Sequence, residues 1–309
     1  MKNIIITGGS GLIGRGLSSY LEKEGNQVGW LSRGKFVDKQ QAYLWNPDKT
    51  ELDMAALTDK DVLIQLAGSN IADGRWTTKR KRDIIESRVK AIQNLYKHLK
   101  KNQLRIPHII QASAIGIYGD RGSEFLNENS HPGNEGFLTE VCKIWETEAT
   151  SLKEFTDCFT IIRTGLYMSP KGGIWPKMIQ TKRFGFLVSF GDGSQFYSWI
   201  HHLDYNRAIS QILKQQLSGV INLTAPNPIS NKDLIFEINQ QLKRKVFQFA
   251  VPEFLLKLIL GELSQSVLSS AFVLPQVLIK SGFEFQFEKL DKAIIDLLNL
   301  KPTDSRVKN

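Results

Sequence analysis

The sequence predicts an α/β fold, in which a doubly wound parallel sheet is followed by a smaller C-terminal α+β lobe that binds substrate. Three observations lead to this prediction. Short apolar segments alternate with helix-like segments through the first 165 residues, a glycine-rich turn joins the first such pair, and the pattern becomes irregular after residue 165. Strands of a parallel sheet are buried on both faces, so they appear as continuous apolar runs with helices between them.

The individual elements follow from the apolar periodicity and the turn residues. Apolar residues spaced three and four positions apart predict helices at 12–24, after the basic run at 79–82, at about 138–155, and at 202–215. The predicted strands lie at 4–7, 27–31, 42–45, 62–67, 108–112, 159–163 and 220–223. A strand that returns after residue 219 would complete the main sheet, and the region from Asn231 onwards would form most of the smaller lobe.

Composition limits the class of protein. Hydrophobic residues make up 41% of the 309 residues and charged residues 23%, which is ordinary for a globular protein and excludes a disordered chain. No apolar run approaches the roughly 18 residues that cross a bilayer. The glycine cluster also follows Met1 too closely for a signal peptide, so we expect a cytoplasmic protein without a membrane segment. Cys142 and Cys158 provide neither a disulfide framework nor a zinc-ligand spacing, so no metal is expected.

The net charge of +9 raises the alternative of nucleic-acid binding. Its most local expression is the run Lys79-Arg80-Lys81-Arg82, which opens a predicted helix with an apolar stripe. Charges beside such a stripe usually form a solvated face, and no aromatic residues are interleaved here for stacking on bases. We therefore expect a small anionic ligand, such as a phosphate-rich cofactor, rather than a nucleic acid.

The strongest local signal is the glycine-rich turn, which a strand enters and a helix leaves. Gly8 and Gly9 permit the tight turn. Gly11 allows the backbone to approach a diphosphate, and Gly14 allows the helix to pack closely on the strand. The first turn of the helix would then offer its free N–H groups to the phosphates. The alternative is a turn that binds no ligand. The predicted cofactor-binding segment is Gly8, Gly9, Ser10, Gly11, Leu12, Ile13 and Gly14.

The end of the second strand indicates which nicotinamide coenzyme is bound. An acidic residue there would accept a hydrogen bond from the ribose 2′-hydroxyl of NAD(H). This chain has Ser32 and Arg33 instead, with Lys35 nearby. A guanidinium pairs well with a 2′-phosphate, so the sequence favours NADP(H), although Arg33 could also be an ordinary surface arginine.

Together with this turn, residues 61–68 and 113–119 resemble the short-chain dehydrogenase/reductase superfamily. The chain is most similar to an atypical, epimerase-like branch of the extended class, whose members are often labelled sugar-nucleotide epimerases or cell-division inhibitors. The resemblance implies an NADP-binding Rossmann domain at 1–165 and 200–229 and a substrate-binding lobe at 166–199 and 230–309. It also places Leu66, Ala67 and Gly68 on the cofactor. Further matching segments are 72–76, 163–165, 198–201, 222–228, 274–275 and 282–283.

The chain departs from that superfamily at the catalytic positions. The resemblance implies a Ser and a Tyr that polarise the substrate oxygen, with a Lys four residues after the Tyr. Ser113 occupies the Ser position, but alignment on Trp145-Glu146 puts Leu138 at the Tyr position and Cys142 at the Lys position. Leucine cannot transfer a proton. Tyr118 is then the nearest alternative acid in the sequence, and it could equally be a packing residue.

Four further residues are candidates for substrate binding. Arg75, Trp76 and Lys171 could line a pocket for an anionic or sugar-like ligand, and His201 could face the substrate from the junction of the two lobes. Alternatively, Trp76 covers the core, the two cations are solvated, and the histidine packs or caps a helix. Cys142 is expected to be a small buried residue, with a reactive thiolate as the alternative.

The sequence therefore supports an NADP(H)-dependent oxidoreductase or epimerase. Its substrate would be a small carbonyl or hydroxyl compound, with nucleotide-linked sugars included. A non-catalytic NADPH-binding regulator is the alternative, because the Tyr/Lys dyad is missing. A nucleic-acid binder is a third and more distant option. The sequence leaves the oligomeric state open.

Overall fold

The computed structural model describes residues 1–33 and 41–299 of the chain. Its main element is an eight-stranded sheet with the order β14-β8-β6-β5-β1-β2-β3-β4. Its central pairs are parallel, as predicted, and β4 adds an antiparallel edge to β3. The strands of this sheet are β1 (Asn3–Thr7), β2 (Gln27–Ser32), β3 (Gln41–Asn46), β4 (Glu51–Leu52), β5 (Val62–Gln65), β6 (His108–Ala114), β8 (Cys158–Thr164) and β14 (Gly219–Leu223).

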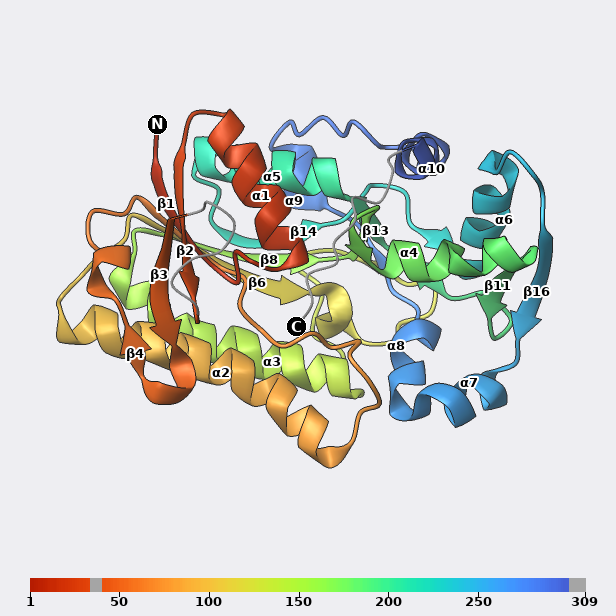
Figure 1. Cartoon of the computed structure of the whole chain (residues 1–309), viewed down its shortest axis with the longest axis horizontal. Helices are drawn as coiled ribbons and strands as arrows, with labels where there is room; N and C mark the ends of the chain where they lie inside the picture. The colour runs from red at the N-terminus through yellow and green to blue at the C-terminus, as the bar shows by residue number, and fades with distance from the viewer. Residues whose placement is uncertain (34–40, 300–309) are drawn as a thin grey trace. The chain divides into compact units, whose positions relative to one another are not determined.

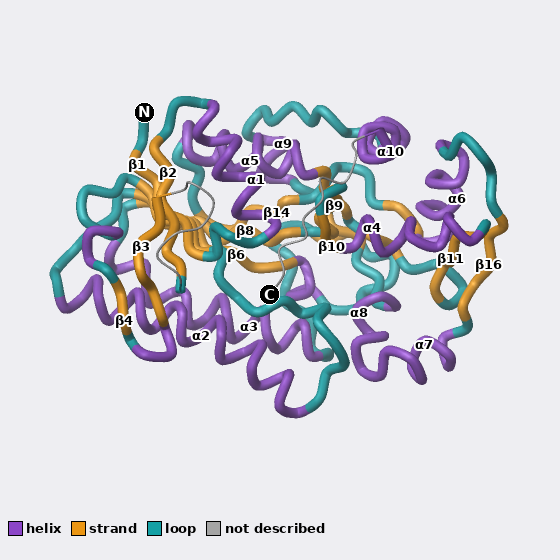
Figure 2. Tube along the Cα trace, viewed as in Figure 1, coloured by secondary structure: helices purple, strands orange, loops and turns teal. Residues whose placement is uncertain are grey.

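Helices cover both faces of this sheet, which confirms the doubly wound α/β fold. Figure 1 shows α1 (Leu12–Lys23) and α5 (His202–Gln215) on one side and α2 (Thr78–Lys101) and α3 (Phe137–Ala149) on the other, and Figure 2 shows the same layering. Because both faces are covered, the side chains of Ile4, Ile5 and Ile6 are all at most 1% exposed. The helix predicted to end near residue 155 ends earlier, and a 3₁₀ segment, Thr150–Phe155, follows it.

The strand order creates a switch point beside β1. The chain passes from β1 to β2 and β3 on one side and then returns to β5 and β6 on the other. Ligands of open α/β sheets bind outside the carboxyl ends of the strands at such a point. The turn after β1 and the segments after β5 and β6 therefore mark the edge at which a ligand is expected.

The basic run at 79–82 lies in the first turns of α2, as predicted. The apolar stripe of this helix is buried, with Ile84, Ile92 and Leu95 all fully enclosed. Thr77 caps the helix by accepting a hydrogen bond from the Arg80 N–H. The fold therefore accounts for this run as the polar part of an amphipathic helix. Within the described residues, no helix has both the length and the apolar character to span a bilayer.

The chain divides into two compact units. The first comprises residues 1–117, 137–163 and 206–221, and the second comprises 118–136, 164–205 and 222–309. These boundaries differ from the predicted domains, most clearly at 118–136, which belong to the second unit. Since the predicted domains concern which part binds coenzyme and which part binds substrate, they remain a prediction.

The second unit has its own core and several small sheets. Three short strands, β9 (Leu166–Ser169), β10 (Gly172–Gly173) and β13 (Trp199–His201), form one of the sheets. The other pairs are β11 (Phe186–Phe190) with β16 (Phe247–Val251), β12 (Phe196–Tyr197) with β15 (Ile229–Ser230), and β17 (Phe272–Val273) with β7 (Phe125–Leu126). The helices are α4 (Ile174–Ile179), α6 (Asn231–Gln241), α7 (Glu253–Leu260), α8 (Ser264–Leu268), α9 (Gln276–Lys280) and α10 (Leu290–Asn299). The core includes Met168, Trp175, Leu187, Trp199, Leu234 and Ile294.

Candidate functional site

The glycine-rich turn follows β1 and leads directly into α1. Gly14 allows close packing in this turn, because a Cβ at this position would lie 2.5 Å from the Gly8 carbonyl oxygen and 2.6 Å from the Gly9 Cα. A Cβ on Gly9 would lie 2.3 Å from the Trp30 ring. The chain's own packing therefore requires glycine at both positions, as the sequence predicted for Gly14.

Gly11 differs from these two glycines. Its φ of −74° suits any residue, and the closest atom to an added Cβ is the Gly8 carbonyl oxygen at 3.2 Å, a contact that a small shift would relieve. Gly11 is also the N-cap of α1, and as a glycine it has no side chain to cap the free N–H groups of this helix. A bare backbone at an uncapped helix N-terminus is the arrangement that a diphosphate requires. The turn therefore fits the phosphates of a dinucleotide.

The neighbouring groups fix the turn in place. Arg15 donates a hydrogen bond from Nε to the Ser10 carbonyl oxygen (2.8 Å), and its guanidinium lies 5.7 Å from the Trp30 ring centroid. The indole of Trp30 in turn donates to Ser18 Oγ at 2.7 Å. Side chains of α1 and β2 therefore support the turn.

The residues predicted to select the coenzyme lie at the end of β2. Ser32 is half-buried and Arg33 is exposed. An exposed guanidinium here is accessible to a 2′-phosphate. Lys35 lies outside the described residues.

The segment after β5 lies beside the glycine-rich turn. The Leu66 and Ala67 N–H groups donate to Thr7 Oγ1 at 3.0 and 3.1 Å, which ties the end of β5 to the end of β1. A Cβ on Gly68 would lie 3.1 Å from the guanidinium carbon of Arg88. Burial lowers the pKa of Arg88 to about 10, so it remains a cation at neutral pH behind this segment. Such a buried positive charge favours an anionic ligand.

Ser113 lies at the carboxyl end of β6, where the sequence placed it, and its hydroxyl has a defined partner. Ser113 Oγ donates to Glu146 Oε1 at 2.6 Å. The Glu146 carboxylate also accepts from Arg163, with Nε 2.9 Å from Oε1 and Nη2 2.8 Å from Oε2. The side chains of Arg163 and Glu146 are only 7% and 12% exposed. The three residues form a shielded, charge-balanced chain between β6, α3 and β8.

The structure places Leu138 and Cys142, to which the resemblance gave the Tyr and Lys positions, beside Gly116, three residues after Ser113. A Cβ on Gly116 would lie 3.2 Å from the Leu138 Cβ and 3.8 Å from the Cys142 Sγ. The Cys142 thiol lies beside Ser113, and burial raises its pKa to about 11. The thiol is therefore protonated at neutral pH, which speaks against a reactive thiolate.

The structure places Tyr118 in the second unit and buries it completely. Its hydroxyl donates to Asn222 Oδ1 at 2.8 Å, and Asn222 in turn donates to the Leu274 carbonyl oxygen at 3.1 Å. This environment favours the packing alternative. A catalytic role for Tyr118 remains a prediction.

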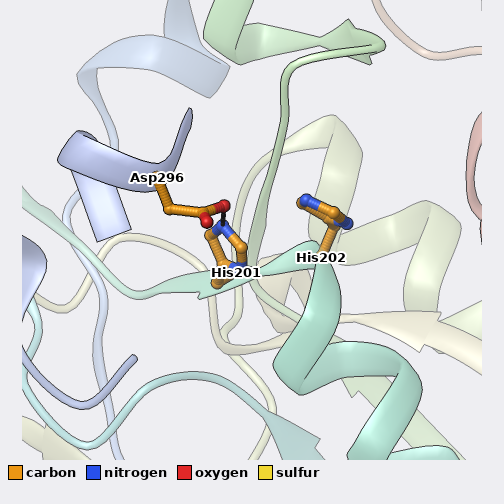
Figure 3. Close-up of side chains that lie close together, drawn as sticks. All are labelled: His201, His202 and Asp296. Carbon is orange, nitrogen blue, oxygen red and sulfur yellow. Dashed lines mark ion pairs between the residues drawn. The ribbon is translucent and has the colours of Figure 1, made fainter. Parts of the chain in front are cut away.

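His201 belongs to a small polar cluster in the second unit, shown in Figure 3. His201 ends β13, His202 begins α5, and Asp296 reaches the His201 ring from α10. One ligand atom from each residue lies within 4.8 Å of the others, which raises the question of a metal. However, His201 Nδ1 accepts a hydrogen bond from the Leu203 N–H at 3.3 Å, so the neutral ring carries its proton on Nε2, which lies 3.2 Å from Asp296 Oδ2. The two atoms approach closely without hydrogen-bond geometry, and neither has a hydrogen-bond partner among the described residues. In this tautomer Nε2 offers no lone pair to a metal ion.

Burial keeps both histidines uncharged. It lowers the pKa of His201 to about 3, with a smaller effect from His202. It lowers the pKa of His202 to about 4, and the charge of Lys171 adds to that effect. Lys171 itself is exposed, whereas His201 is fully buried. Substrate binding by Lys171 and His201 remains a prediction.

The other predicted substrate residues lie in the loop before α2. Arg75 is exposed, and Trp76 is 5% exposed. The indole of Trp76 donates to the Ile71 carbonyl oxygen at 3.0 Å, and its ring packs edge-on against Phe137 at 4.9 Å. These contacts make Trp76 part of the core of the first unit. A role for Arg75 in ligand binding remains a prediction.

Two of the three hydrogen-bonded residues around Ser113 were not predicted to act in the site, namely Glu146 and Arg163. Glu146 served only to align the helix, and Arg163 only to support the resemblance. A signal was nevertheless available for Glu146, because Leu138, Cys142 and Glu146 are spaced by four and therefore share one face of α3.

Comparison with known proteins agrees with this architecture. The profile of the NAD dependent epimerase/dehydratase family matches residues 4–224, and a domain of unknown function, DUF1731, matches residues 251–297. Epimerase family protein YfhF from Bacillus subtilis (strain 168) is 33% identical over 299 residues, which cover 96% of this chain and 98% of YfhF.

Two solved structures are similar over nearly the whole chain. The human epimerase family protein SDR39U1 (isoform2), solved with NADPH, has a TM-score of 0.85 at 24% identity and covers 96% of this chain and 100% of its own. The nucleoside-diphosphate sugar epimerase from Corynebacterium glutamicum has a TM-score of 0.76 at 29% identity. That match covers 98% of this chain but only 59% of the bacterial one.

Proposed function

Since this chain belongs to the NAD dependent epimerase/dehydratase family, we propose that it is an NADP(H)-dependent oxidoreductase or epimerase of the extended short-chain dehydrogenase/reductase type. One observation carries the proposal. The turn after β1 leaves the Gly11 backbone bare at the uncapped N-terminus of α1, which is a cradle for a diphosphate. The bound coenzyme would supply hydride chemistry, and the chain's own residues would bind and orient the substrate and move its proton.

The preference for NADP(H) rests on Arg33. This residue is exposed at the end of β2, where an acidic residue would select NAD(H). The human relative solved with NADPH supports the same choice. Titration of the protein with NADPH and with NADH, followed by coenzyme fluorescence, tests it. We expect tighter NADPH binding, and Arg33→Asp should weaken NADPH binding without weakening NADH binding. An Arg33→Asp protein that kept its NADPH affinity would remove the assignment.

The substrate would be a small carbonyl or hydroxyl compound, and nucleotide-linked sugars belong to this class. The name of the Corynebacterium relative, a nucleoside-diphosphate sugar epimerase, supports sugar nucleotides. The purified protein is incubated with NADPH and a panel of carbonyl compounds, or with NADP⁺ and panels of secondary alcohols and UDP-sugars. Turnover is measured from the absorbance of the reduced coenzyme. Tight coenzyme binding without turnover of any panel would speak against an enzyme.

A non-catalytic NADPH-binding regulator is the second candidate. The observation that favours it is the pair Leu138 and Cys142 at the positions of the superfamily's Tyr and Lys, because neither side chain can perform the usual proton transfer at neutral pH. In that case Ser113→Ala would leave both coenzyme binding and the cellular effect unchanged. Loss of the cellular effect in a Ser113→Ala protein that still binds NADPH would favour the enzyme instead.

A further inference from the structure

The end of β6 holds proton-transferring groups that differ from a Tyr/Lys pair. Ser113 is 3% exposed and gives its hydroxyl proton to Glu146 over a 2.6 Å hydrogen bond. Both oxygens of that carboxylate are held by the Arg163 guanidinium. Arginine stays protonated in proteins and cannot accept a proton. Within this chain of three residues, Glu146 is therefore the group that can accept one.

The direction of this hydrogen bond decides what Ser113 can offer to a ligand. A serine hydroxyl has one proton and two lone pairs. Because the proton points to Glu146, Ser113 Oγ can only accept a hydrogen bond from a ligand. A hydroxyl group meets this requirement, whereas a carbonyl oxygen does not. The resting site is therefore complementary to an alcohol.

The position of Ser113 in the sheet places such an alcohol near the expected coenzyme. Ser113 lies at the carboxyl end of β6, which pairs in parallel with β5, and β5 pairs with β1. The carboxyl ends of these strands share one edge, at which ligands of this fold bind. The glycine-rich turn after β1 and the proton acceptor behind Ser113 thus serve the same edge of one compact unit.

We propose that Ser113 and Glu146, braced by Arg163, form a proton relay that takes the hydroxyl proton of a secondary alcohol in place of the superfamily's Tyr/Lys dyad. This inference rests on the proposed function and deepens it. The alcohol O–H bond breaks as its proton moves to Ser113 Oγ, while the serine's own proton moves to Glu146 Oε1. The hydride of the same carbon leaves with its electron pair to the oxidised nicotinamide coenzyme, and a carbonyl forms. The substrate class is therefore a secondary alcohol, and the first step is an oxidation.

Other groups near Ser113 are poorly suited to accept the proton. Leu138 carries no polar group, and the protonated Cys142 thiol, whose pKa burial raises to about 11, has no free site for a proton at neutral pH. Ser113 is thus the residue that would touch the substrate. Glu146 and Arg163 act through it, as positioning residues and proton store.

The first test needs no turnover. A hydroxyl proton held in a 2.6 Å bond to a shielded carboxylate should exchange slowly with water and resonate downfield. NMR of the full-length protein carrying ¹³C-labelled serine, with and without NADPH, should show one such proton. Ser113→Ala should remove it and Glu146→Gln should shift it upfield. The proposal is overturned if this proton is absent from the wild type or if Glu146→Gln leaves it unchanged.

The second test measures the oxidation itself with NADP⁺ and three probes: cyclohexanol, 1-indanol and UDP-glucose. Glutamine keeps the shape of Glu146 and can still bond to Arg163, but it cannot take the proton. We expect Glu146→Gln and Ser113→Ala each to lower kcat by about 10²-fold or more with little change in KM, the usual loss when a proton acceptor is removed. The matched control is Glu140→Gln, the same change at an exposed position of α3, which should leave kcat unchanged.

The outcomes separate this inference from the function on which it rests. If neither coenzyme binds, the proposed function fails, and the NMR test still reports on the hydrogen bond. If the wild type oxidises a probe and Glu146→Gln does so equally well, the relay is overturned while the oxidoreductase stands. Coenzyme binding without oxidation of any probe also overturns the relay. A fall in kcat with little change in KM, seen in Ser113→Ala and Glu146→Gln but not in Glu140→Gln, supports the relay.

Discussion

The glycine-rich turn gives the sharpest prediction, because its glycines are required for different reasons. Replacing Gly11 with alanine adds one methyl group at a residue with φ −74° and ψ 175°, a conformation that alanine adopts readily. The nearest atom is the Gly8 carbonyl oxygen at 3.2 Å. Replacing Gly14 instead puts the methyl group 2.5 Å from that same oxygen and 2.6 Å from the Gly9 Cα, and both are backbone atoms.

The two substitutions should therefore have different costs. For Gly11→Ala, the gain from a less flexible unfolded chain, about 0.4–1 kcal/mol, offsets a poorer helix cap, so the unfolding free energy should change little. The added methyl group would lie where the diphosphate approaches, and we expect at least a tenfold loss of affinity, or about 1.4 kcal/mol. Gly14→Ala should lose roughly 1–3 kcal/mol of stability as well, because the helix must move away from the strand.

The assay is urea unfolding with and without NADPH, combined with fluorescence titration of the coenzyme. A ligand at 100 times its Kd adds about 2.7 kcal/mol of stability, and a tenfold weaker ligand at the same concentration adds only about 1.4 kcal/mol. Gly11→Ala should have the wild-type unfolding free energy without NADPH and should gain only about 1.4 kcal/mol when NADPH is added. If it binds NADPH as tightly as the wild type, the diphosphate does not approach Gly11 and the proposed cofactor site is wrong.

Three further predictions concern the groups buried around the site and in the second unit. Tyr118→Phe should cost about 1–3 kcal/mol in urea unfolding, because it leaves Asn222 Oδ1 without its donor, and should leave turnover unchanged; a large loss of kcat would instead show Tyr118 to be an acid. Arg163→Met should cost about 3–5 kcal/mol, because it leaves the Glu146 carboxylate shielded and unpaired, and adding Glu146→Gln should recover part of that loss. Burial lowers the pKa of His108, His201 and His202 to about 4, 3 and 4, below the ordinary value, so the unfolded chain takes up protons first. The unfolding free energy should then fall as the pH drops from about 6.5 towards 4, by up to about 1.4 kcal/mol per pH unit for each histidine, and His201→Phe should flatten that slope.

Much of the fold could be predicted because its signals are local. Three consecutive isoleucines put apolar side chains on both faces of β1, which is typical of a strand in a sheet covered on both sides. The glycine spacing after β1 identifies the first βαβ unit. The predicted α/β fold and the resemblance to the epimerase-like short-chain dehydrogenases are both confirmed. The division at residues 118–136 could not be predicted, because it depends on which distant strands pair, as β7 does with β17.

The candidate site shows where local signals end. Ser113 could be placed because it terminates a recognisable strand, but its partner is 33 positions away in sequence. The spacing of Glu146 from Leu138 and Cys142 indicates a shared face of α3, but it does not show that this carboxylate is buried and paired while Glu140 on the same helix is exposed. The difference arises only when β8 brings Arg163 against the face of α3 that carries Leu138 and Cys142. A missing Tyr/Lys pair is therefore a weak argument against catalysis, because the fold can bring a proton acceptor to the same serine from another turn of the helix.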